Sequence, residues 1–212
     1  MLSSSKNNLP PMPPVLKGYE HIKRYWDKTH NSYAAKILPG EYYVTMNNEY
    51  VTTVLGSCVS ACVRDTKLGI GGMNHFMLPV NRGSVDVSSI SDAARYGNFA
   101  MEHLINDIMH NGGQRKNLEF KLFGGGKVMK IGLDVGQKNI DFVLDYMTTE
   151  GYYIAAQDLG DNYPRKVHYF PKTGKVKMKK LIRMHNDTIT RREEKYLDQL
   201  KVEPVEGEIE LF

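Results

Sequence analysis

Hydrophobic and polar positions alternate along much of the chain, in short runs that are rich in β-branched and aromatic residues. Turn residues separate these runs, a pattern typical of β-strands. The strands predicted in this way cover residues 41–46, 50–55, 59–65, 70–78, 118–126 and 152–160. A hairpin is predicted over residues 165–181, with Pro171 and Gly174 in its turn.

Two longer segments have the 3.6-residue apolar period of helices instead. Ile140, Val143, Leu144 and Met147 are spaced i, i+3, i+4, i+7 and predict a helix over 136–149. Residues 88–113 have the same kind of pattern and end at a Gly-Gly pair. The order of these elements predicts an α+β fold, in which two helices cover a mainly antiparallel sheet and a second sheet layer lies behind.

The two ends of the chain differ in character from this central part. Residues 1–37 are predicted to be an N-terminal extension, because four prolines near its start exclude regular structure there; a short helix is allowed over 17–37. Residues 38–182 form the predicted domain. Residues 183–212 are a C-terminal extension, in which Thr190 and Glu193 form a capping box that opens a short helix through Leu200.

Composition narrows the class of protein. The 212 residues are 41% hydrophobic and carry a net charge of +4 that is spread along the chain. Nucleic-acid binders usually concentrate their charge in a denser stripe, so no nucleic acid is expected as a partner. No apolar run approaches the roughly 20 residues of a membrane span, so no direct membrane insertion is expected. Only 2 cysteines and no signal-peptide core favour a reducing, cytoplasmic setting.

Cys58 is the first candidate for chemistry. It follows Gly56 and Ser57, and a glycine lets the chain turn sharply so that backbone N–H groups face a substrate. The alternative is a buried core thiol, since free cysteine is among the most buried residue types. Cys62 lies about 13 Å further along a predicted strand, too far to share a metal ion with Cys58. No metal and no cofactor is therefore expected.

His75 and Thr52 are candidates through strand geometry. A hairpin of residues 59–65 and 70–78 pairs position 75 with about position 58, which brings the imidazole beside the thiol. Thr52 lies six residues before Cys58, so the two share a face if the strand runs straight. Its hydroxyl can then hold the ring of His75 in one tautomer. Thr52 as an ordinary β-branched strand residue is the alternative reading.

These motifs together resemble the CheD family of chemoreceptor glutamine deamidases. The resemblance rests on Val54 to Cys58 with Thr52 before them, and on Gly71 to Pro79 after them. Segments 121–129, 134–139 and 158–176 agree with it, so that it covers about residues 38–182. Thr52, rather than Thr53, keeps the family's spacing to the cysteine. The loop from Gly160 to Arg165 departs from the family's pattern.

The resemblance implies a layered α/β/β sandwich and a catalytic triad of Cys58, His75 and Thr52. It implies hydrolysis of glutamine side chains to glutamate on methyl-accepting chemotaxis receptors, through a thioester on the cysteine. Backbone N–H groups of the loop with Gly56 and Ser57 are expected to bind the substrate oxygen. The expected partners are the cytoplasmic helical bundle of the receptors and the phosphatase CheC. A non-catalytic adaptor that binds receptors or CheC, and a toxin-like cysteine deamidase, are the alternatives.

Overall fold

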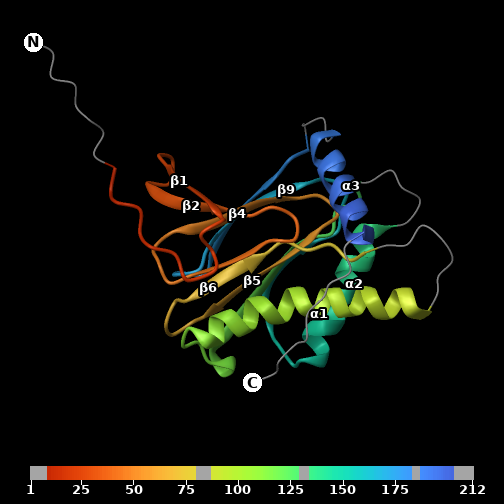
Figure 1. Cartoon of the computed structure of the whole chain (residues 1–212), viewed down its shortest axis with the longest axis horizontal. Coiled ribbons are helices and arrows are strands. Elements are labelled where there is room, and N and C mark those ends of the chain that lie inside the picture. The colour runs from red at the N-terminus through yellow and green to blue at the C-terminus, as the bar shows by residue number, and fades with distance from the viewer. Residues whose placement is uncertain (1–8, 80–86, 129–133, 183–186, 203–212) are drawn as a thin grey trace, which may run out of the picture.

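The computed structural model describes residues 9–79, 87–128, 134–182 and 187–202, and these contain two five-stranded sheets and three α-helices (Figure 1). The first sheet has the strand order β1-β2-β4-β9-β10, and the second has the order β3-β6-β5-β7-β8. The strands of the first sheet are β1 (Lys23–Asp27), β2 (Ser32–Lys36), β4 (Tyr50–Leu55), β9 (Arg165–Phe170) and β10 (Lys175–Lys180). Those of the second sheet are β3 (Tyr42–Thr45), β5 (Val59–Asp65), β6 (Gly71–Asn74), β7 (Leu118–Gly124) and β8 (Ile154–Leu159).

The layers follow the order sheet, sheet, helices. In β5, six of the seven residues are buried, which is expected for the central strand of a sheet that is covered on both faces. The first sheet covers one face of the second sheet, and the helices α1 (Val87–His110) and α2 (Val135–Thr149) cover the other (Figure 1). The α/β/β sandwich is confirmed. Within the described residues, no helix has the length and apolar character that crossing a membrane requires.

Most strand pairs are antiparallel, as the sequence predicts. The exceptions are β2 with β4 and β7 with β8, which are parallel and make both sheets mixed. The segment between the parallel strands β7 and β8 contains α2, which packs back onto the second sheet. The helices and strands predicted for the central part of the chain are all present, with ends that differ by a few residues.

The Gly71-Gly72 pair owes its presence to strand packing. A β-carbon at Gly72 would lie 2.1 Å from the carbonyl oxygen of Tyr43 in β3, and one at Gly71 would lie 2.4 Å from that of Val63 in β5. No side chain fits at either position without moving backbone atoms. The two glycines therefore let three strands of the second sheet pair closely just before His75.

The prediction for the N-terminal segment is wrong. Residues 17–37 contain no helix but the hairpin of β1 and β2, and β2 pairs with β4 in the first sheet. Residues 23–36 are therefore part of the folded domain. The physical reason is the partner strand: Ala34 and Ala35, which are fully buried, pair with Tyr50 and Val51 of β4.

A buried ion pair joins this hairpin to the rest of the domain. The Arg24 guanidinium on β1 lies 2.6 Å from the carboxylate of Glu49, whose side chain is fully buried. The hydroxyl groups of Tyr43 and Thr45 also donate to Glu49, at 2.7 and 2.6 Å. Removal of the arginine would leave a buried carboxylate without its countercharge.

We expect Arg24→Met to lower the free energy of unfolding by about 3 kcal/mol, the usual cost of breaking one partner from a buried ion pair. Lys23→Met is the matched control, because Lys23 is the exposed neighbour on the same strand. Chemical denaturation of the two variants measures the difference. Equal stability of both variants would mean that the hairpin is not part of the domain's core.

Candidate active site

Cys58 lies where the chain crosses from one sheet to the other. Strand β4 of the first sheet ends at Leu55, and β5 of the second sheet begins at Val59. Gly56 and Ser57 make the crossing, and the thiol of Cys58 is fully buried between the layers. We call residues 56–58 the nucleophile loop.

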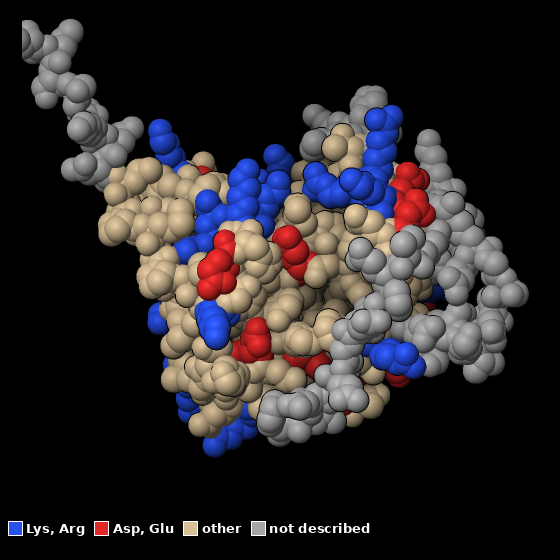
Figure 2. Space-filling model, in the orientation of Figure 1, with Lys and Arg blue, Asp and Glu red and all other residues tan. Residues whose placement is uncertain are grey.

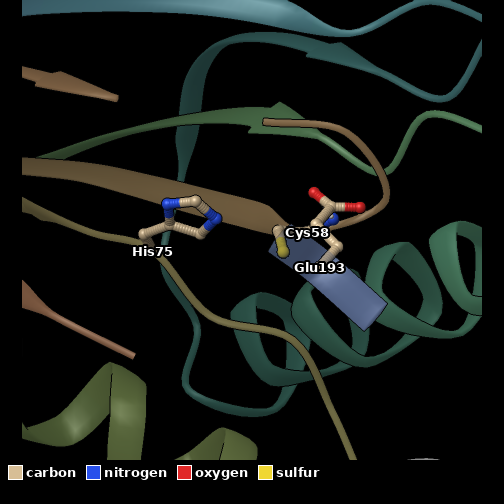
Figure 3. A group of neighbouring side chains, drawn as sticks. All are labelled: Cys58, His75 and Glu193. Carbon is tan, nitrogen blue, oxygen red and sulfur yellow. Dashed lines mark hydrogen bonds between the residues drawn. The ribbon is translucent and has the colours of Figure 1, made fainter. Parts of the chain in front are cut away.

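His75 lies beside this loop, as predicted, but in a register shifted by two residues. Val59 and Phe76 exchange both backbone hydrogen bonds, at 2.9 and 3.0 Å, so position 75 is opposite position 60. His75 and Cys58 are then diagonal neighbours on one face of the sheet. The sulfur of Cys58, a ring nitrogen of His75 and a carboxylate oxygen of Glu193 lie within 4.8 Å of one another (Figure 3).

The hydroxyl of Thr53 holds the imidazole of His75. Its oxygen lies 2.8 Å from Nδ1 of the ring and 2.9 Å from the carbonyl oxygen of Ile37. The only hydroxyl proton is donated to that carbonyl, so Thr53 must accept its other hydrogen bond from an Nδ1–H group. The ring is thereby fixed in the tautomer whose Nε2 carries a lone pair. Nε2 is buried and has no hydrogen-bond partner among the described residues.

The assignment of Thr52 to this task is wrong. Neighbouring residues of a strand point to opposite faces, and Thr52 lies on the face of β4 away from His75. It pairs with His168 of β9, and its hydroxyl has no partner among the described residues. The count of six residues from Cys58 fails because the chain changes sheets at Gly56 and Ser57, where strand alternation does not continue.

The N–H groups of the nucleophile loop converge on one carboxylate. Glu193 of the helix α3 (Asp187–Val202) accepts hydrogen bonds from the backbone N–H groups of Gly56 and Ser57, both at 2.8 Å, and from that of Cys58 at 3.4 Å. The Ser57 hydroxyl donates at 2.6 Å. Hydrogen bonds to a charged group contribute about 1.5–3 kcal/mol each, which offsets the desolvation of this buried carboxylate.

The carbonyl groups of the same loop are held from the opposite side. Gly126 N–H donates to the Gly56 carbonyl at 2.7 Å, and Gly125 N–H donates to that of Cys58 at 2.8 Å. The Ser57 carbonyl accepts from the side-chain amide of Asn139 in α2, at 2.8 Å. The carbonyl groups of Gly56 and Ser57 share rigid peptide planes with the N–H groups of Ser57 and Cys58, so the contacts with Gly126 and Asn139 fix these two N–H groups in the direction of Glu193.

Asn139 holds the nucleophile loop through a contact that the sequence does not predict. It is fully buried, and its side-chain oxygen accepts from the N–H of Leu78 at 2.8 Å. One side chain therefore connects the nucleophile loop to the segment that follows His75. The segment 134–139, which ends at Asn139 and resembles a motif of the family, is the signal in the sequence that points to this residue.

The capping box predicted for Thr190 and Glu193 is wrong. Helix α3 begins at Asp187, so Thr190 lies inside the helix and cannot be its N-cap. The carboxylate is 1% exposed and binds backbone groups about 136 residues away in the chain. No local pattern identifies such a contact, since the capping-box spacing is compatible with either role.

Burial and charge set the protonation of the two reactive groups. Burial, with the adjacent Glu193 carboxylate as a further cause, raises the pKa of the Cys58 thiol well above its usual value. Burial lowers the pKa of His75 to about 3, and the positive charge of Arg192 acts in the same direction. With Glu193 in place, the site therefore holds a neutral thiol and a neutral imidazole.

The grouping of Cys58, His75 and Glu193 also contains the atom types that bind zinc. Both carboxylate oxygens of Glu193, however, already accept hydrogen bonds from the nucleophile loop. Hydrogen bonds alone thus account for the position of this carboxylate. Cys62, the second thiol, is fully buried in β5 opposite Met73 and belongs to the core.

Comparisons with known proteins agree on one family. A family model described as "CheD chemotactic sensory transduction" matches residues 77–180, a segment that begins after His75. A probable chemoreceptor glutamine deamidase CheD from Halorhodospira halophila is 54% identical over 100% of this chain and 99% of its own length. Its counterpart from Hahella chejuensis is 51% identical over 100% of both chains. That from Hydrogenovibrio crunogenus is 53% identical over 84% of this chain and 93% of its own.

The hydrogen bonds of Thr53 predict the tautomer of His75, and nitrogen-detected NMR of the ring can measure it. We expect a neutral Nδ1–H tautomer that persists at about pH 5, because burial lowers the pKa of His75 to about 3. Thr53→Val removes the acceptor of the Nδ1–H group and should change the tautomer ratio. Thr52→Val, the same change on the neighbouring residue, should leave it as it is. The reverse result would return the orienting role to Thr52.

Proposed function

The chain belongs to the CheD family, and we propose that it works with Cys58 as nucleophile, His75 as general base and Thr53 as the residue that orients the base. Its activity is that of a chemoreceptor glutamine deamidase, a protein-glutamine glutaminase. Water converts a glutamine side chain of a chemoreceptor to glutamate, and ammonia is released.

The first half of the proposed reaction forms a thioester. Nε2 of His75 takes the proton of the Cys58 thiol, and the thiolate attacks the amide carbon of the glutamine. The oxygen of that amide becomes negatively charged and accepts hydrogen bonds from the N–H groups of the nucleophile loop. Loss of one such donor costs about 3 kcal/mol in comparable sites. The protonated His75 then gives its proton to the departing ammonia.

The second half restores the enzyme. His75, neutral again, takes a proton from a water molecule that attacks the thioester carbon. The bond between carbon and sulfur breaks, the product leaves as a glutamate carboxylate, and the thiol of Cys58 regains a proton. One water molecule is consumed, and the proton that the new carboxylic acid gives up converts the released ammonia to ammonium, so that atoms and charge balance.

One observation carries this mechanism: the lone pair of Nε2 in His75. The nitrogen is buried, is aimed by Thr53 and has no other partner among the described residues, while a thiol lies next to it (Figure 3). A buried polar atom without a hydrogen bond is costly and needs a reason. Abstraction of the thiol proton is such a reason.

The alternatives from the sequence fit the site less well. An adaptor that only binds receptors needs neither an oriented base nor N–H groups aimed at one point. A toxin-like deamidase does not fit the full-length similarity to the CheD relatives. Three parts of the proposal rest on the resemblance to the CheD family alone. They are the receptors' helical bundle as the substrate surface, CheC as a further partner, and the cytoplasm as the location. The two free cysteines are compatible with a reducing compartment.

We expect Cys58→Ala to abolish deamidation of a purified receptor fragment, because it removes the thiol that lies within 4.8 Å of a ring nitrogen of His75. Intact-mass spectrometry follows the reaction, since each conversion of glutamine to glutamate adds about one dalton. Cys62→Ala is the control: it removes the other buried thiol, should cost about 1 kcal/mol in stability and should keep the rate within a few-fold. Equal loss of activity in both folded variants would contradict the distinct roles of the two cysteines.

We expect Thr53→Val to lower kcat ten-fold or more, or about 1.4 kcal/mol in the barrier, with little change in KM. The side chain keeps its shape but no longer fixes the tautomer of His75. Thr52→Val should act at most on stability, since its hydroxyl has no partner to lose among the described residues. A wild-type kcat for Thr53→Val would remove the threonine from the mechanism and leave Cys58 and His75.

A further inference from the structure

Helix α3 has an unusual inward face. Ile189, Glu193 and Leu197 follow each other at intervals of four residues and are 9, 1 and 1% exposed, so that they form one buried stripe. An acidic residue at the centre of an apolar stripe is unfavourable unless the surface it meets offers hydrogen bonds. The outward face is exposed and basic, with Arg191, Arg192 and Lys195. Figure 2 shows Lys and Arg side chains on the upper part of this helix and over the strands beside it.

The surface that α3 covers is the candidate active site. All three N–H groups of the nucleophile loop and the Ser57 hydroxyl donate to the carboxylate of Glu193. A carboxylate oxygen lies within 4.8 Å of both the Cys58 sulfur and a ring nitrogen of His75 (Figure 3). A glutamine deamidase produces a glutamate side chain beside its nucleophile. Glu193 is itself a glutamate side chain, and its carboxylate lies beside Cys58.

The fit around α3 is close on both sides of the carboxylate. A β-carbon at Gly56 would lie 2.7 Å from a Glu193 oxygen, so only glycine allows this approach. The ring of Tyr196 packs over Gly40, where a β-carbon would lie 2.7 Å from its hydroxyl. The Tyr196 hydroxyl also contacts that of Tyr96 in α1. The helix is thus held at the site by its own shape as well as by one carboxylate.

We propose that α3 is a built-in mimic of the reaction product: Glu193 occupies the glutamate subsite and keeps the free protein in a closed resting state. This inference rests on the proposed deamidase function and names the occupant of its site. A receptor glutamine must displace the helix before it reaches Cys58. The subsite, as α3 fills it, accepts a side chain that projects from an α-helix, so a helical segment is the form in which substrate is expected to dock.

The protonation states fit a closed site. The negative charge of Glu193 is one of the causes that raise the pKa of the Cys58 thiol, and removal of the helix removes that contribution. Because the helix belongs to the same chain, its effective concentration at the site is high, and a dilute substrate competes poorly with it. Release of α3 by the docking of a receptor would therefore couple activity to substrate binding.

A single substitution converts the mimic into a substrate. In Glu193→Gln, the side chain at the site is the amide on which the enzyme acts. The thiol of Cys58 should attack this amide, release ammonia and form an internal thioester, and water should then hydrolyse the thioester to leave glutamate at position 193. The chain gains about one dalton, located by peptide mass spectrometry to residue 193. We expect conversion to be at least ten-fold faster than in the same variant that also carries Cys58→Ala.

Glu194→Gln is the matched control for this experiment. Residue 194 neighbours the mimic in sequence but lies at a half-buried position of α3, and the backbone N–H groups of the nucleophile loop donate to Glu193 instead. A glutamine there should stay a glutamine for as long as the conversion at 193 is followed. Conversion at both positions, or conversion that persists without Cys58, would show chemistry unrelated to the site and would overturn the proposal.

Glu193→Ala tests the resting state from the other direction. We expect the rate on a receptor fragment to rise ten-fold or more at low substrate concentration, mainly through a lower KM, with circular dichroism confirming the fold. If the wild type is active but Glu193→Ala is no faster and Glu193→Gln is not converted, the resting-state proposal fails while the deamidase stands. If the wild type, Glu193→Ala and Glu193→Gln all show no turnover, the proposed function itself fails.

Discussion

The hydrogen-bonding requirement of three backbone N–H groups governs the active region of this protein. Between Leu55 and Val59 the chain leaves one sheet and enters another, so residues 56–58 have no neighbouring strand to accept from their N–H groups. Buried backbone donors without a partner are costly. The carbonyl groups of Gly56 and Ser57 are bound by Gly126 and Asn139, so the N–H groups of Ser57 and Cys58, which lie in the same peptide planes, cannot turn away. The site is therefore built to receive an oxygen anion.

The N–H groups that serve the reaction also bind the carboxylate of Glu193. A negatively charged oxygen forms briefly during the hydrolysis of an amide, and a carboxylate forms at its end. The N–H groups that stabilise the first will also bind the second, which makes a glutamate a natural inhibitor. Glu193 meets this requirement with a residue of the same chain. A deamidase with such a helix would keep its thiol covered until a receptor arrives.

Strand alternation and packing decide which of two neighbouring residues contacts the site. Thr53 and Thr52 differ by one position, yet one holds His75 and the other lies on the opposite face of β4. Gly71 and Gly72 precede the histidine because β3 and β5 approach them closely. The two glycines help to place His75 through strand packing and take no part in the chemistry. The hairpin of β1 and β2 closes the first sheet beside β4, which carries Thr53.

The sequence by itself determined the elements of residues 41–181, the layered fold class and the pairing of Cys58 with His75, because apolar period and turn chemistry are local and one hairpin joins the two residues. It also determined that Gly56 and Ser57 free the backbone before the thiol. Only the tertiary structure decided between Thr52 and Thr53, since the change of sheet at residues 56–57 breaks the count of alternating faces. The strands of residues 23–36 needed a partner strand that their own sequence does not contain. Glu193 and Asn139 reach the nucleophile loop from 136 and 82 residues away, distances over which no spacing in the chain carries information.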